Sequence, residues 1–374
     1  MTALETTDAQ SDPVAEQRDA LLARLNDAMT TTFEFAAVYM GDRLGYYAAM
    51  APGDPLTSTD LASRTGTNER YTREWLEEQA MAGFIDVDNP GARPIERRFR
   101  LSPAHAEVLT NRDSLNYWAP QCRAGISCVR VIDQVLDAFR TGRGIPFANY
   151  GADMSEGLAD ATRMAYLDLL SAEWLPADPE LHARLQADPP ARVADIGVGG
   201  GWSSIAIARA HPKVTVDGFD LDPASVEIAT RNVAESGLSD RVRIQLRDAS
   251  DPGLAGQYDV AVAFSCIHDM SDPVAALRSM RRLTSEEGIV LIGGETNCGD
   301  DFLGDGTHRE VERQMYGASI LHCLPVAMSE QPSAAAGTVM RPGMLRGFAQ
   351  EAGFRDIRTL PIDDDWSAFY RLLN

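Results

Sequence analysis

A glycine-rich turn after a short apolar run constrains the fold more than any other part of this 374-residue chain. Residues 193–202 read VADIGVGGGW, with Asp195 two residues ahead of Gly197. Glycines at 197, 199 and 201 keep the backbone free of side chains where it turns tightly and approaches a ligand. The spacing D-x-G-x-G-x-G differs from the dinucleotide motif G-x-G-x-x-G, because Trp202 occupies the place of the third glycine. The pattern predicts a strand that ends in a nucleotide-binding loop.

Strands and helices alternate after this turn. A second strand over 214–220 (VTVDGFD) ends in Asp220, and a third over 241–246 precedes Asp248. Further apolar strands are predicted over 258–265 and 288–295, and the segment from 344 to the end reads as helix, strand, turn, strand. This order predicts an α/β fold with a doubly wound parallel sheet, a terminal antiparallel hairpin, and a ligand at the carboxyl ends of the strands.

Together these motifs resemble the Rossmann-like class I methyltransferases that depend on S-adenosylmethionine (SAM), and the resemblance covers about residues 189–374. It implies that the cofactor lies against nine positions, which are Asp195, Gly197, Gly199, Gly201, Asp220, Leu221, Asp248, Ala249 and Ser265. The loop would hold the methionine end, Asp220 the ribose and Asp248 the adenine. A strand-end carboxylate suits a ribose because it accepts charge-assisted hydrogen bonds from two hydroxyls. The alternative is that Asp220 and Asp248 only cap the helices that follow.

The loop after the fourth strand, 266–272 (CIHDMSD), contains the candidate catalytic residue. It looks like the H-D-W-S-D segment of O-methyltransferases that carry a winged-helix dimerisation domain, with Met270 in place of the tryptophan. The resemblance implies that His268 removes the proton of a substrate hydroxyl and that Glu295, at the end of the fifth strand, orients it. An imidazole suits this role, because a phenol of pKa about 10 is a poor nucleophile until it loses its proton. The alternative is that His268 is a loop residue without a catalytic part.

The first half of the chain has a different pattern. Residues 1–19 are polar and predicted to be disordered, whereas apolar residues at helical spacing between 19 and 50 predict one long or two short helices. A capped helix over 57–65, a second helix over 68–83 and a two-stranded segment after it predict a winged-helix domain over 20–112. Its second helix carries Glu74, Glu77 and Glu78, which favours a dimerisation module of a homodimer over a DNA-reading domain.

A helical connector over 113–187 links this domain to the SAM-binding domain over 188–374. The connector and an insertion over 296–338 are rich in bulky apolar residues, which suit the wall of a small-molecule site. The candidates for contact with a substrate are Trp118, Met164, Trp174, Met315 and Tyr316.

Composition limits the partners. A net charge of −21 argues against nucleic acid and anionic membranes, because phosphate binding needs a basic face. Five cysteines without a C-x-x-C pair favour a reducing cytoplasm, no segment resembles a signal peptide or a membrane span, and no metal motif is present. The sequence therefore predicts SAM-dependent methylation of a small molecule at a hydroxyl, with S-adenosylhomocysteine (SAH) as product. It leaves open methylation at carbon or nitrogen, and a SAM-binding regulator without transferase activity.

Overall fold

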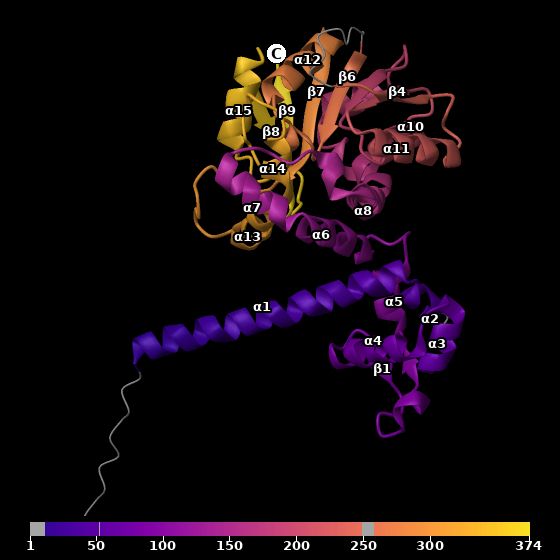
Figure 1. Ribbon diagram of the computed structural model, residues 1–374. Coiled ribbons are helices and arrows are strands. Elements are labelled where there is room, and N and C mark those ends of the chain that lie inside the picture. Colours follow the sequence, from indigo (N-terminus) through magenta and orange to yellow (C-terminus); the bar gives the residue numbers. More distant parts are fainter. Residues whose placement is uncertain (1–11, 52, 249–257) are drawn as a thin grey trace, which may run out of the picture. The chain divides into compact units, whose positions relative to one another are not determined.

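The computed structural model describes residues 12–51, 53–248 and 258–374, and it divides into two compact units, Met1–Asn111 and Arg112–Asn374 (Figure 1). The connector predicted from the sequence is part of the second unit.

The first unit consists of a long helix followed in the chain by a winged-helix domain. Its elements are α1 (Pro13–Arg43), α2 (Tyr46–Met50), α3 (Ser58–Thr65), α4 (Glu69–Met81), β1 (Asp86–Val87), η1 (Pro94–Glu96), β2 (Phe99–Arg100) and α5 (Pro103–Thr110). Thr57 and Asp60 form a capping box at α3, Asn68 caps α4, and β1 pairs antiparallel with β2 to form the wing. The predicted order of two helices and a wing is confirmed.

Residues 13–19 were predicted to belong to a disordered tail, and this was wrong. They form the first turns of α1, because the Asp12 side chain accepts a hydrogen bond from the Val14 amide and Pro13 stands at the first helical position. Capping therefore outweighs the polar composition of this segment.

Three basic side chains of α4 and the wing are paired with acids. Arg97 contacts Glu77 at 2.7 Å and Arg73 contacts Glu69 at 3.3 Å, while Arg70 pairs with Glu74. These pairs neutralise the cations that a recognition helix and wing would need for phosphate contacts.

The second unit is built on a seven-stranded sheet. Its strands are β3 (Arg192–Ile196), β4 (Thr215–Asp220), β5 (Val242–Leu246), β6 (Tyr258–Phe264), β7 (Thr284–Thr296), β8 (Asp356–Thr359) and β9 (Ser367–Leu373). The spatial order is β5-β4-β3-β6-β7-β9-β8, with β5 to β7 parallel and β9 antiparallel to both neighbours. The strand order reverses direction between β3 and β6, which is where open α/β sheets bind ligands. The predicted sheet and terminal hairpin are confirmed.

Helices cover both faces of this sheet (Figure 1). The helical elements of the unit are α6 (Ala119–Arg130), α7 (Ile132–Thr141), η2 (Phe147–Tyr150), α8 (Ala152–Met164), the π-helical segment η3 (Ala165–Trp174), α9 (Pro179–Gln186), α10 (Trp202–Ala210), α11 (Pro223–Glu235), η4 (Ile267–Asp269), α12 (Pro273–Leu283), α13 (Arg309–Ala318), η5 (Ser319–Cys323), α14 (Leu324–Ala327) and α15 (Pro342–Glu351). Alternate strand residues enter two cores: Val193 packs with η3, α9 and α10, whereas Ala194 packs with α12 and α15.

In the part of the chain that the structure describes, no helix has both the length and the apolar character needed to cross a membrane.

Candidate active site

The glycine loop between β3 and α10 has the backbone that its sequence predicts. Gly197, Gly199 and Gly201 have φ angles of 67°, 51° and 79°, in the left-handed region that side chains disfavour. A Cβ at Gly197 would meet Cys266 Sγ at 2.7 Å. The Gly199 amide donates a hydrogen bond of 2.8 Å to Asp220 Oδ2, so the loop is tied to the end of β4.

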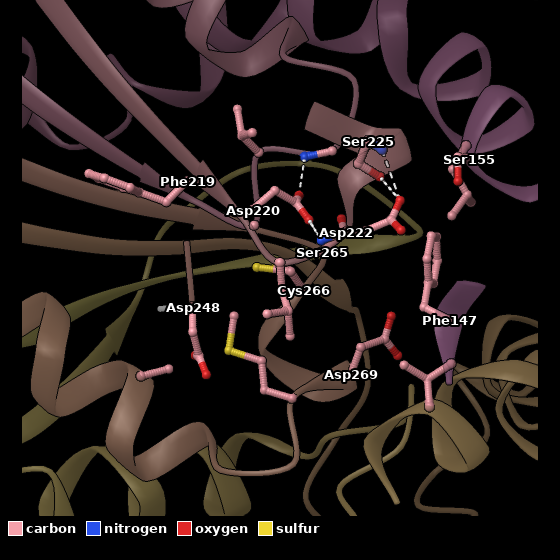
Figure 2. Close-up of a pocket in the computed structure, with 18 of the residues that line it drawn as sticks. Phe147, Ser155, Phe219, Asp220, Asp222, Ser225, Asp248, Ser265, Cys266 and Asp269 are labelled. Atoms are coloured by element: carbon pink, nitrogen blue, oxygen red, sulfur yellow. Dashed lines mark hydrogen bonds between the residues drawn. The ribbon is translucent and has the colours of Figure 1, made fainter. Parts of the chain in front are cut away.

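Asp220, at the end of β4, accepts hydrogen bonds from two backbone amides. Its Oδ1 accepts the Asp222 amide at 2.9 Å, in addition to the Gly199 amide on Oδ2 (Figure 2). Burial raises the pKa of Asp220 above its usual value, against these backbone hydrogen bonds, which lower it. Asp222, and not Asp220, caps α11, because it accepts the Ser225 amide at 2.8 Å. Asp220 is therefore not the cap of α11.

Asp195 lies beneath the loop. Its Oδ2 accepts hydrogen bonds of 2.6 Å from the hydroxyls of both Ser203 and Ser204, at the start of α10. Burial raises the pKa of Asp195 to about 6. Asp195 does not line the cavity described next, so it holds the loop and α10 in place rather than facing a ligand directly.

A cavity of about 720 Å³ opens at the carboxyl ends of the strands (Figure 2). Of the predicted cofactor residues, six line it, namely Gly197, Gly199, Asp220, Leu221, Asp248 and Ser265. Gly201 lies next to it as the N-cap residue of α10, and Ala249 falls outside the described residues. The volume lies within the range of small-molecule sites.

Ser265 is strained. Its φ angle is 53°, which is uncommon for a residue with a side chain, and it directly follows β6. The amide donates to Gly293 O at 2.8 Å and the hydroxyl to Gly294 O at 2.9 Å, so β7 holds the residue in this conformation. Strain of this kind is concentrated at functional sites.

His268 and Glu295 form a buried pair. His268 Nδ1 lies 2.6 Å from Glu295 Oε2, and the two residues are 6% and 0% exposed. Burial lowers the pKa of His268, but the carboxylates of Glu295 and Asp269 outweigh it and hold this pKa well above 6.5. The two residues are 27 positions apart in the sequence, and they meet because the ends of β6 and β7 are adjacent in the sheet.

Asp269 separates this pair from the cavity. His268 does not line the cavity, whereas Asp269 does, and His268 Nε2 lies 3.4 Å from Asp269 Oδ1. His268 Nε2, the ring nitrogen that does not contact Glu295, therefore faces the Asp269 carboxylate. Within the described residues, Asp269 Oδ1 and Glu295 Oε1 are buried without a hydrogen-bond partner.

Ligand atoms of His268, Asp269 and Cys323 lie within 4.8 Å of one another, a spacing that would also suit a metal ion. Burial raises the pKa of Cys323 to about 11. We assign no metal to this group.

The five candidate substrate residues are not at the cavity wall, and that prediction was wrong. Trp174 is 6% exposed and packs on Phe369 at a ring distance of 4.8 Å, and the Tyr316 hydroxyl accepts a hydrogen bond from Arg341. The remaining candidates, Trp118, Met164 and Met315, also lie outside the cavity lining. Apolar bulk alone does not separate a cavity wall from ordinary packing.

Both predicted segments nevertheless contribute to the wall, with other residues. The connector supplies Phe147, Ser155, Leu158, Thr162 and Tyr166, and the insertion supplies Val326, Ser329, Glu330, Gln331 and Pro332. Their positions depend on how η2, α8 and the segment after α14 fold over the sheet. The sequence marked one further wall residue, Trp202, because it stands where the dinucleotide motif has its third glycine. Trp202 lines the cavity.

Comparisons with known proteins agree with this architecture. Residues 193–288 match a family described as "Methyltransferase domain", and residues 36–111 match the "Rv2258c-like winged HTH domain". The sequence predicted a class I methyltransferase fold that follows a winged-helix domain in the chain, and this is confirmed.

Solved structures share the fold over nearly the whole chain. The mitomycin 7-O-methyltransferase has a TM-score of 0.71 at 19% identity, covering 96% of this chain and 99% of that one. Human N-acetylserotonin methyltransferase in complex with SAM has a TM-score of 0.67 at 18% identity, covering 98% and 99%. At this identity the likeness concerns the fold.

Curated relatives match over a shorter stretch. The ubiquinone biosynthesis O-methyltransferase of Bordetella avium is 34% identical over 122 residues, which are 33% of this chain and 47% of the relative. The polyketide synthase ThaQ of Burkholderia thailandensis is 25% identical over 141 residues, 38% of this chain and 6% of the relative. This chain thus spans less than half the length of these relatives.

Proposed function

We propose that the protein transfers the methyl group of SAM to a hydroxyl of a small molecule and releases SAH. The observation that carries the proposal is one cavity bordered by the glycine loop and Asp220 on one side and by the His268–Glu295 pair behind Asp269 on the other. The methyltransferase-domain match and the O-methyltransferases among the relatives support it.

The residues present fit this cofactor. Three glycines of the loop, Gly197, Gly199 and Gly200, line the cavity, and a Cβ at Gly200 would meet that of Ala159 at 2.6 Å. Asp220 would accept hydrogen bonds from the ribose, Asp248 would face the adenine, and Ser265 and Leu221 would complete the wall. When bound, SAM supplies a methyl group on a positively charged sulfur. The chain supplies position and exclusion of water.

His268 is proposed as the base. Its Nδ1 faces Glu295, so Nε2 on the side of Asp269 takes up the proton that the acceptor hydroxyl loses. Glu295 fixes the ring and stabilises the imidazolium that results. Oxygen is preferred as the acceptor atom because a base is needed where a neutral hydroxyl must lose its proton.

The proposal is tested by SAH formation from SAM with panels of phenols, amines and carbon acceptors. We expect turnover with hydroxyl acceptors only. Turnover with amines or carbon acceptors alone would overturn the preference for oxygen. Cofactor binding without turnover, together with retention of DNA at physiological salt, would indicate a regulator instead.

We also propose that the protein is a homodimer that assembles through its first unit. Helix α1 and its C-cap residue expose a row of large apolar side chains that are 41–72% exposed, namely Val14, Leu21, Leu22, Leu25, Met29, Phe33, Met40 and, at the cap, Leu44. An apolar surface of this extent is costly to leave in water.

Light scattering at micromolar concentration should give twice the chain mass, and Leu25→Glu with Met29→Glu should give the monomer. A monomeric parent protein would contradict the proposal.

The five cysteines lie in the described residues and form no disulfide there, which supports a reducing compartment, and we propose the cytoplasm.

A further inference from the structure

We propose that the acceptor carries a positive charge, such as a protonated amine, and that Asp269 binds it. The inference rests on the proposed function, because it concerns the acceptor end of the same cavity. Among the described residues that line the cavity, six are acids, namely Asp220, Asp222, Asp248, Asp269, Asp272 and Glu330, and one is basic, Arg247.

The acids fall into two groups. Asp220, Asp222 and Asp248 follow β4 and β5, on the side assigned to the nucleoside, and Arg247 is on this side as well. Asp269, Asp272 and Glu330 come from the loop before α12 and the segment after α14. No basic side chain of these two segments lines the cavity in the part that the structure describes.

Asp269 keeps its negative charge toward the cavity. Its neighbour His268 is matched by the fully buried Glu295 at 2.6 Å, so a protonated His268 and Glu295 together are neutral. The next acid along the loop is already used, since Asp272 Oδ1 accepts the Ala275 amide at the start of α12. Asp269 Oδ1 lies against His268 Nε2 at 3.4 Å, and the residue also lines the cavity, so its carboxylate borders both. Asp269 is thus the carboxylate of this group that is best placed for a ligand.

Phe147 adds an aromatic ring to the acceptor side of the cavity. Figure 2 shows Phe147 and Asp269 on the same side of the cavity, away from Asp248. Tyr166 and Trp202 also line the cavity, but the Trp202 ring already faces the Arg163 guanidinium at 5.1 Å. A carboxylate beside aromatic faces favours an alkylammonium, through a charge-assisted hydrogen bond and cation–π contacts. A carboxylate on the acceptor would meet like charges instead, and the net charge of −21 acts in the same direction.

The test compares three phenols that differ only in the charge of the side chain: tyramine, 4-ethylphenol and 3-(4-hydroxyphenyl)propionate. Binding to the full-length protein saturated with SAH is measured by calorimetry. We expect tyramine to bind at least about tenfold more tightly than the propionate, with 4-ethylphenol between them. In Asp269→Asn the difference should shrink below about threefold, while 4-ethylphenol binds within about twofold of its affinity for the parent protein.

Asp168→Asn is the matched control, because it removes one negative charge from an exposed position of η3 outside the cavity. It should leave the order and the size of the difference unchanged. Equal binding of the three phenols, tighter binding of the propionate, no binding of tyramine at 10 mM, or an unchanged difference in Asp269→Asn would each overturn the inference. Turnover is followed separately: charge-selective binding without SAH formation rejects the proposed methyl transfer and leaves the charge preference standing.

Discussion

Replacing Asp220 by alanine should weaken SAM binding by about 10- to 150-fold, which corresponds to about 1.5 to 3 kcal/mol. Two losses contribute. The ribose hydroxyls lose a charged acceptor, and the Gly199 amide loses the 2.8 Å hydrogen bond that ties the glycine loop to β4. Calorimetry with SAM on the purified variant measures the effect.

Asp220→Asn separates these two contributions. The amide offers one oxygen in place of two, so it still accepts from either Gly199 or Asp222 while the charge on the ribose side is lost. We expect an affinity between those of the parent and the alanine variant, and Asp168→Asn serves again as the charge control outside the cavity. A folded Asp220→Ala protein with unchanged affinity would remove Asp220 from the site.

The sheet and its cofactor side were predictable because their signals are local. A buried parallel strand is a short apolar run, and Gly197, Gly199 and Gly201 stand where the backbone needs positive φ angles. The pairing of His268 with Glu295 followed from a family resemblance that joins two strand ends. The burial of Asp195 beneath the loop was not predictable, because the sequence does not show that the hydroxyls of Ser203 and Ser204 donate hydrogen bonds to it.

The acceptor side was not predictable, because no local pattern marks it. Trp174 and Phe147 are both large aromatic residues in the connector, yet the first packs on Phe369 and the second lines the cavity. The difference arises from the way η3 and η2 pack on distant parts of the chain. Ser155 and Thr162 lie seven residues apart on α8, and they were missed because the prediction weighed apolar bulk and not the helix face that the cavity meets.

Replacing His268 by alanine should lower the turnover of a hydroxyl acceptor by about 10²- to 10⁴-fold. SAM affinity should stay within about threefold, because the imidazole acts on the proton of the acceptor and does not line the cofactor side. An acceptor that is already ionised at the assay pH should lose much less activity than a protonated one. Equal losses on both acceptors, or no loss on either, would show that His268 is a structural residue of the loop.

The pH profile gives a second, independent measure of the same base. Glu295 and Asp269 hold the pKa of His268 well above 6.5, and only the neutral imidazole accepts a proton. For a protonated acceptor, kcat/KM should therefore rise with pH through a midpoint above 6.5 in the parent protein. In Glu295→Gln the main group that raises this pKa is gone while burial, which lowers it, remains, so the midpoint should move to lower pH. The variant should also lose less activity than His268→Ala, since it keeps the imidazole. A midpoint that is the same in both proteins would assign the titration to a group other than His268.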